Sequence, residues 1–317
     1  MESAQLQAYT YKTLPTPDNT LDDIPLRTNC PLDDGRPSDG STQQQQPLGS
    51  LDVFLPDEVI LAILPRLDVL SLSTFRRVNR RAMGLVDCLH EYRTMRRHFP
   101  DVLRAILSIR ATHFDTATLF DTLCTERCSG CAGRNFGSHL YLITCERVCQ
   151  PCFTSRRRFF PISGVVDRHG VDPDVVDLDR LPRVLSVPGT YTAICLRVRK
   201  RVVLYDLETL VDRAAIQRSG DGDTLRLDRL DLEDKEPRRY MGVISAPYFT
   251  ERGRRAYWGA YCALCVDAAC VEPSYKIKYT ETGLGRHMME WHGVDVDEEK
   301  VGRRDLGPYH CPQTALP

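Results

Sequence analysis

The chain has 317 residues, of which 42% are hydrophobic and 27% are charged, and its formal net charge is −1. These values allow a sizeable globular core, and the near-neutral balance excludes a global field that would draw the chain onto nucleic acid or an anionic membrane. No secretory signal and no apolar run of roughly 18 residues is visible, so we expect a soluble, intracellular protein without a membrane span.

Residues 1–50 are rich in Pro, Asp, Asn, Gln and Gly and contain almost nothing to bury. Because such a segment cannot offset the entropy that it would lose on ordering, the sequence predicts a disordered N-terminal tail. From Leu51 to about Leu123 the composition changes to Leu, Ile and Val at helical spacing, without the alternation that is typical of strands. We therefore expect this stretch to be helical throughout.

The first helix candidate is LPDEVILAILPRL, at Leu55–Leu67. Pro56 suits the start of a helix, and the two acidic residues that follow it place negative charge where the helix dipole favours it. Pro65 should end or kink the helix. The apolar arc covers on the order of half of the helix circumference, which is broader than the single stripe of an ordinary surface helix. This surplus of apolar surface indicates a second packing partner.

Two more short helices are expected in DVLSLSTFRRV and NRRAMGLVDCL. The order Leu-Pro-x-Glu-hydrophobic, a Leu-x-x-Leu helix end, a leucine-led second helix and Val-x-Arg-Arg resembles an F-box, over about 45 residues. Asn79 and Ala82 depart from this family, which often has Cys or Ser at the first position and an aromatic residue at the second. The resemblance implies docking to a Skp-type adaptor and, through it, to the cullin scaffold of an SCF-type ubiquitin ligase.

The docking that this resemblance implies would use apolar anchors on the first two helices, because an amphipathic helix in a groove gains most of its affinity from such residues. The alternative is an ordinary capped helix that packs only within its own chain. Some of the anchors must hold the three helices together, and the sequence does not sort them. The expected adaptor-facing residues are Leu55, Pro56, Ile60, Leu64, Leu67 and Leu72.

A cluster of six cysteines follows the helical stretch, with Cys128-x2-Cys131 and Cys149-x2-Cys152 separated by 17 residues. Clustered pairs at this spacing in a reducing compartment indicate a structural zinc site with four thiolates, closed to substrate. Cys124 and Cys145 are left over. They are either buried as small apolar residues or replace one of the four, and the x3 spacing favours Cys145 as the substitute.

The six-cysteine cluster also resembles that of fungal F-box proteins with a cysteine-rich zinc-binding region. In those proteins a segment like LPRVLSVPGTY follows, which here is Leu181–Tyr191. The stretch 184–206 around it alternates like two strands. LETLVDRAAIQR then reads as an amphipathic helix, and SGDGDTLRLDRLDLEDKEP reads as an exposed acidic loop.

A second Cys/His group lies near the C-terminus, where Cys262-x2-Cys265 is followed after 21 residues by His287-x4-His292. Two histidines at this spacing lie near one side of a helix and suit one metal ion, so we expect a second structural zinc site. In the alternative reading both histidines are ordinary surface or core-edge residues. Substitute ligands are Cys270, His310 and Cys311.

Two other classes of function fit the sequence less well. Basic runs could indicate a zinc-finger-like nucleic-acid-binding protein or a general interaction protein, but acidic residues are interspersed and the net charge is slightly negative. No phosphate-cradling glycine loop, nucleophile elbow or open metal motif indicates an enzyme. The sequence therefore predicts a non-catalytic, substrate-recruiting F-box subunit.

The predicted fold class is α+β, with a three-helix F-box followed by a zinc-stabilised mixed region. The expected segments are a disordered tail at 1–50, an F-box at 51–98, a helical linker with a four-cysteine zinc element at 99–160, a mixed strand and helix region at 161–250, and a zinc element of two cysteines and two histidines with a tail at 251–317.

Overall fold

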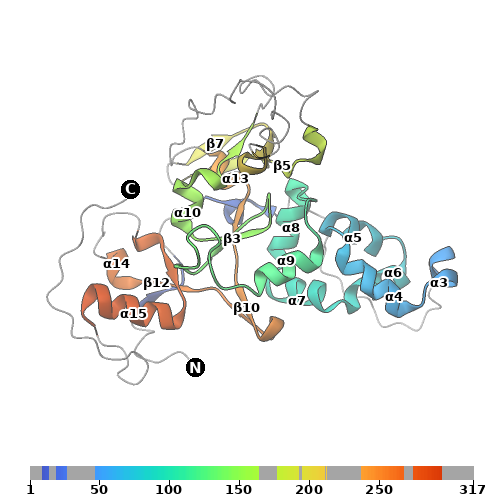
Figure 1. Ribbon diagram of the computed structural model, residues 1–317, viewed down its shortest axis with the longest axis horizontal. Coiled ribbons are helices and arrows are strands. Elements are labelled where there is room, and N and C mark those ends of the chain that lie inside the picture. Colours follow the sequence, from blue (N-terminus) through green and yellow to red (C-terminus); the bar gives the residue numbers. More distant parts are fainter. Residues whose placement is uncertain are drawn as a thin grey trace.

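The protein is described by a computed structural model that covers residues 9–13, 19–26, 47–163, 177–192, 195–210, 212, 237–267 and 274–294. A helical N-terminal region is followed by small antiparallel sheets that carry two groups of Cys and His residues, so the predicted α+β class is confirmed. The first helices of the N-terminal region lie at one end of the long axis, and the C-terminal group of Cys and His residues lies at the other (Figure 1). None of the described helices combines the length and apolar character needed to cross a membrane.

Capping side chains mark where several helices of the N-terminal region begin. The side chains of Asp68, Asn79 and Asp115 accept hydrogen bonds from backbone N–H groups in the first turns of the following helices. The helix that begins at Asp57 ends at Ile63, and Pro65 lies in the 3₁₀ turn that follows it, so the helix ends near this proline as expected. The elements are α3 (Ser50–Phe54), α4 (Asp57–Ile63), η2 (Leu64–Arg66), α5 (Val69–Arg76), α6 (Arg80–Cys88), α7 (His90–His98), α8 (Pro100–Ile109) and α9 (Thr116–Leu123).

The first three helical segments of the expected F-box do not form an isolated unit. The carboxylate of Asp87 on α6 accepts from Arg76 on α5 at 2.9 and 3.0 Å, and from Arg96 on α7 at 2.8 Å. Thr116 at the start of α9 donates through both its N–H and its hydroxyl to the carbonyl of Leu67. The helices up to α9 therefore share one core with the segments that follow.

The strands of the described residues form five small sheets, all with antiparallel pairing. Their strand orders are β3-β2-β9, β4-β8-β5, β6-β7, β10-β11 and β1-β12-β13. The strands are β1 (Thr10–Tyr11), β2 (His139–Tyr141), β3 (Glu146–Val148), β4 (Pro161–Ile162), β5 (Arg183–Leu185), β6 (Gly189–Tyr191), β7 (Leu196–Val198), β8 (Val203–Asp206), β9 (Val243–Ser245), β10 (Tyr248–Thr250), β11 (Arg255–Tyr257), β12 (Ala260–Cys262) and β13 (Lys278–Tyr279).

Helical turns connect these sheets. The central β3-β2-β9 sheet places Leu140 between Arg147 and Ile244 and lies beside α9 and α10. The connecting elements are η1 (Leu21–Asp23), α10 (Gln150–Ser155), η3 (Arg157–Phe159), η4 (Leu178–Arg180), α13 (Arg238–Met241), η6 (Glu251–Gly253), α14 (Ala263–Asp267), η7 (Ser274–Lys276) and α15 (Glu281–His292).

The stretch 184–206, expected to form two strands, contains parts of four. Pro188 cannot donate a ladder hydrogen bond, and the chain turns there from β5 into β6. β5 then pairs with β8, while β6 pairs with β7. The expected helix after it begins at residues 207–210, and its remainder, except for residue 212, lies outside the described residues together with nearly all of the acidic loop.

The expected disorder of residues 1–50 is wrong for the described segments 9–13 and 19–26. β1 pairs with β12, and the N–H of Ala263 donates to the carbonyl of Tyr9 at 2.9 Å. In η1 the side chain of Leu21 is fully buried, and Asp22 accepts from the N–H of Ser245 on β9 at 2.7 Å. Asn19 donates to the carbonyl of Thr192 at 2.6 Å. These short segments are ordered because they pair with, or hydrogen-bond to, strands and side chains far away in the sequence. The rest of the tail up to residue 46 lies outside the described residues.

Candidate metal centres

The first cysteine pair lies in a tight turn. Cys128 and Cys131 frame this turn, which an isolated bridge between Arg127 and Phe136 closes. A methyl group on Gly130 would lie 2.6 Å from the ring of Phe159 and 3.1 Å from the sulfur of Cys152. The glycine between the two cysteines is therefore required, because it lets the turn approach the opposite pair.

The second cysteine pair begins α10. Cys149 caps this helix after β3 ends, and its backbone N–H donates to the sulfur of Cys128 at 3.2 Å. Asn135 donates from its backbone to Cys131 at 3.4 Å and from its side chain to Cys149 at 3.5 Å. Donors of this kind stabilise negative charge on sulfur.

The four sulfur atoms of Cys128, Cys131, Cys149 and Cys152 lie within 4.8 Å of one another, and all four residues are buried. A tetrahedral ion bound to four thiolates at about 2.3 Å places its ligands about 3.8 Å apart, so the group fits such an ion. Hydrogen bonds from Cys149 and Cys152 lower the pKa of the Cys128 thiol to about 2, whereas the hydrogen bond to Cys128 raises the pKa of Cys152 to about 12. Four thiolates this close require a cation to be ionised together.

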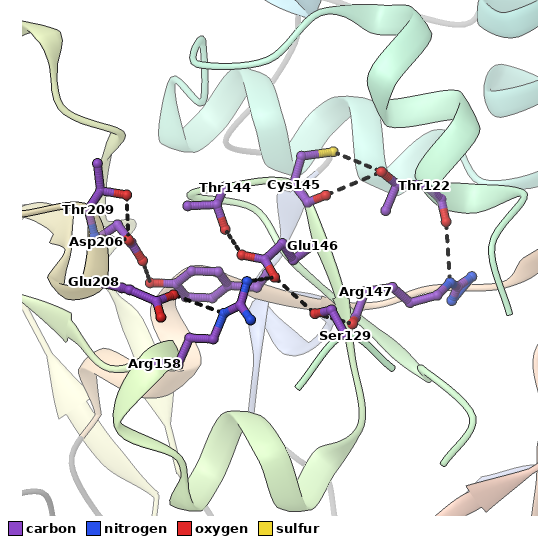
Figure 2. Close-up of polar contacts among 11 residues, drawn as sticks. Thr122, Ser129, Thr144, Cys145, Glu146, Arg147, Arg158, Asp206, Glu208 and Thr209 are labelled. Atoms are coloured by element: carbon purple, nitrogen blue, oxygen red, sulfur yellow. Dashed lines mark hydrogen bonds and ion pairs between the residues drawn. The ribbon is translucent and has the colours of Figure 1, made fainter. Parts of the chain in front are cut away.

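The two leftover cysteines lie outside this group. Cys145 is buried, and its thiol donates to the hydroxyl of Thr122 at 3.7 Å, which in turn donates to the carbonyl of Cys145 at 3.2 Å (Figure 2). Burial raises the pKa of the Cys145 thiol to about 12, and it also raises the pKa of half-buried Cys124. Of the two alternatives left open by the sequence, the structure supports the one in which neither cysteine replaces a ligand: Cys145 is not among the four clustered sulfurs, and its thiol contacts Thr122 of α9.

The β2–β3 hairpin fastens the first centre to the core through two charged residues (Figure 2). Glu146 accepts from the hydroxyls of Ser129 and Thr144 at 2.9 and 2.8 Å, and from Arg158 at 2.7 Å. Arg147 is buried, and burial lowers its pKa to about 9. Its guanidinium donates only to backbone carbonyls among the described residues, namely those of residues 122, 137, 246 and 247. Sequence reasoning missed both residues, because nothing local marks a buried arginine.

The second group is built by β12, α14 and α15. Cys262 ends β12, Cys265 lies one turn later in α14, and both histidines come from the last turns of α15. The sulfur of Cys265 lies 3.2 Å from Nε2 of His287 and 3.3 Å from Nε2 of His292. Stacking on Tyr279, with ring centroids 4.5 Å apart, fixes the plane of the His287 ring.

These four ligand atoms also lie within 4.8 Å of one another. A hydrogen bond from Cys265 is the largest of the interactions that lower the pKa of the Cys262 thiol to about 4. Two sulfurs and two imidazole nitrogens suit a tetrahedral ion of intermediate softness. The substitute ligands Cys270, His310 and Cys311 lie outside the described residues. The structure therefore brings all eight predicted metal ligands together in two compact groups.

The six expected adaptor-facing residues divide into three classes. Ile60, Leu64 and Leu72 are buried in the core of this chain, which corrects the expectation that they face a partner. Leu55 and Leu67 are half-buried, and Pro56 is exposed. The core needs the three buried residues because α4 and α5 pack on the helices that follow.

Five other apolar residues on or next to helices α3 to α6 are exposed, and none of them was among the expected adaptor-facing residues. Val53 is 76% exposed, Phe54 is 78% exposed and Ile63 is 46% exposed, and Val59 and Val78 are also exposed. These five exposed residues, on α3, on α4 and between α5 and α6 at the helical end of the molecule, are together called the apolar end surface. A helical wheel of residues 55–67 cannot find Val53 and Phe54, because they belong to the preceding helix α3.

No protein-family model matches this chain, and neither a curated protein nor a solved structure matches it.

Proposed function

We propose that this chain is a target-recruiting F-box subunit of a cullin-based ubiquitin ligase, with two structural zinc ions. The helices α4, α5 and α6 follow one another in the order that the F-box resemblance implies. In this proposal they dock a Skp-type adaptor, which in turn binds the cullin scaffold. Ubiquitin transfer takes place on other chains, and this subunit raises the local concentration of the target near the charged ubiquitin carrier.

The observation that carries the proposal is the apolar end surface. Phe54 and Val53 are more than three-quarters exposed, which is unusual for large apolar side chains in a folded region. They lie beside the LPDEV start of α4, at the end of the molecule remote from the C-terminal group (Figure 1). An apolar surface at this place supports association with an adaptor groove.

Zinc is the metal that best suits both centres. Closed sets of four sulfurs, or of two sulfurs and two imidazole nitrogens, are typical of structural zinc sites. All ligands except His292 are buried, so neither set offers an open position for a substrate. The ions would hold segments far apart in the sequence and would not take part in catalysis.

The rival reading, a zinc-finger-like nucleic-acid-binding protein, has less support. In such fingers the helix that carries the histidines also carries the groups that contact nucleic acid. Here that helix, α15, has one arginine, Arg286, and two glutamates, Glu281 and Glu290. This charge does not make a phosphate-binding face.

Co-expression with a Skp-type adaptor tests the proposal. We expect a stoichiometric complex with the wild type. Phe54→Asp with Ile63→Asp should weaken the complex by about a hundredfold, because two apolar anchors are lost. Both side chains are exposed, so the fold should survive; Leu64→Asp would not be informative, because Leu64 is buried.

Leu196→Asp provides the matched control. Leu196 is an exposed apolar residue of β7, away from the helical end of the molecule. The control should bind the adaptor like the wild type. If the wild-type chain does not bind, or if the double variant binds as tightly as the control, the proposed function is wrong.

A further inference from the structure

A cleft of about 730 Å³ lies between the two metal centres. One wall is the turn of the first centre, residues 126–136, and the other is formed by residues 277–291 of the C-terminal group. The volume is in the range of about 300–1,000 Å³ that is typical of ligand sites. Each wall contains ligands of one centre, so bound metal would hold both walls in place.

Three arginines face this cleft from both walls. Arg127 and Arg134 belong to the turn of the first centre, and Arg286 belongs to α15. Arg134 donates to the carbonyl of Cys131 at 3.3 Å, but within the described ranges none of the three is paired with a carboxylate. Guanidinium groups without an acidic partner are available to bind the carboxylates of a ligand, in bidentate geometry.

An aromatic surface lies beside these arginines. Trp291 is 46% exposed, and its ring is stacked on the ring of His287 with the centroids 6.0 Å apart. Tyr279 also stacks on this imidazole and lines the cleft. Tryptophan and arginine are among the residues that most often dominate the binding energy of protein interfaces.

Two carboxylates, Glu126 and Glu290, also line the cleft, so its side chains carry a net charge of about +1 when the metal-ligating His287 is counted as neutral. The two acidic groups would repel a continuous phosphate backbone passing through the cleft. A peptide with a few carboxylates between uncharged residues can pair with the arginines and avoid the glutamates. The charge pattern therefore favours an acidic peptide over nucleic acid.

We propose that this cleft binds an acidic peptide segment of the target protein. Its Asp or Glu carboxylates pair with Arg127 and Arg286, and a neighbouring apolar or aromatic side chain packs on Trp291. This inference rests on the proposed function, because it places the target site of that ligase subunit. The cleft is remote from the apolar end surface, which leaves a target accessible while an adaptor is bound (Figure 1).

The test is a selection from a displayed library of random peptides about twelve residues long, enough to span the cleft, on the purified full-length chain. We expect selected peptides to be enriched in Asp and Glu. Fluorescence polarisation of the best peptide is then measured with Arg127→Glu and Arg286→Glu combined. This variant should bind at least about tenfold more weakly, because two charge-assisted contacts are replaced by repulsion.

The matched control is Arg197→Glu with Arg199→Glu, which makes the same charge change at exposed positions outside the cleft. It should bind the peptide within about twofold of the wild type, since distant exposed charges are screened. Equal loss in both double variants, no enrichment of acidic peptides, or tighter binding of a mixed-sequence oligonucleotide that depends on Arg127 and Arg286 would overturn the proposal.

The adaptor complex is measured on the same protein preparations. If the cleft variant loses the peptide and keeps the adaptor, both proposals stand. If the wild-type chain binds the peptide through the cleft and forms no adaptor complex, the ligase function fails while the peptide site remains. If the adaptor binds and no acidic peptide is selected, the cleft proposal alone fails.

Discussion

The two metal centres have equally compact ligand sets but very different surroundings. The cysteines of the first centre belong to the large core that contains helices α4 to α9 and the β3-β2-β9 sheet. Cys262 and Cys265 of the second centre form a separate small cluster in which Leu284 and Met288 are the other buried apolar residues of the described chain. The first ion would therefore brace an existing core, whereas the second would supply much of the interior of its own unit. A unit that small depends on its metal to fold.

The largest effect is expected at the first centre. Replacing Cys128 and Cys149 by serine should destabilise the whole chain, because the lost metal-binding energy, on the order of 10 kcal/mol, is comparable to the stability of a domain. Thermal unfolding followed by circular dichroism should show a lower or absent cooperative transition. Cys124→Ser, outside the group, is the control and should unfold like the wild type. An unchanged transition in the double variant would contradict the structural role of the first centre.

A smaller, local effect is expected at the second centre. Cys265→Ser should abolish structure in β12 and α15 and leave the main core intact, because the two clusters are separate. Hydrogen exchange should rise in β12, α14 and α15 and in β1, which pairs with β12. Protection of β2 and β3 should stay at the wild-type level. Loss of protection throughout the chain would mean that the two centres form one cooperative unit.

The two centres should also lose their metal ions at different pH values. The pKa of Cys262 is lowered to about 4 and that of Cys128 to about 2. A thiolate with a depressed pKa contributes stability at neutral pH that diminishes as the pH falls and is lost at its folded pKa. Because protons compete with the ion for thiolate and imidazole ligands, bound metal measured after ultrafiltration should fall as the pH is lowered, and the second centre, whose His292 is only partly buried, should lose its ion first. Simultaneous release of both ions would contradict this order.

The smallest effects come from one glycine in each centre. Gly130→Ala should destabilise the chain by about 1–3 kcal/mol, because its methyl group meets Phe159 and Cys152. Gly285→Ala in α15 should stabilise its helix by about 0.5–1 kcal/mol, because the added methyl group meets no atom within 4 Å beyond its chain neighbours and the backbone of its own helix. Urea unfolding, followed by circular dichroism for the first variant and by hydrogen exchange of α15 for the second, measures both. Effects of the same sign would contradict the difference in packing.

The parts of this fold that could be predicted from sequence are those fixed by local chemistry. The Cys-x2-Cys pairs and the capping residues Asp68, Asn79 and Asp115 act within one turn, so their spacing alone indicates them. Leu21 could not be predicted as buried, because its surroundings come from strands more than a hundred residues later. The same holds for Arg147, whose acceptors lie on segments far apart in the sequence.

The sequence also could not show which apolar residues of the first helices are buried and which are exposed to a partner. A helical wheel identifies an apolar arc, but only the position of the neighbouring helices decides which side of the arc is covered. The core covers Ile60 and Leu64 and leaves Ile63 exposed, although all three are apolar residues of one segment. Phe54 extends that exposed surface from a helix that the F-box pattern does not include.

A native mass spectrum of the freshly purified chain tests most directly whether two different metal centres organise this protein. We predict two zinc ions per wild-type chain, two in Cys124→Ser, and one in Cys265→Ser. The remaining ion in Cys265→Ser should be held by the first centre and should resist acid better than the ion that was lost. A wild-type chain that carries no metal or only a single ion, or a Cys265→Ser chain that keeps two ions, would contradict the account.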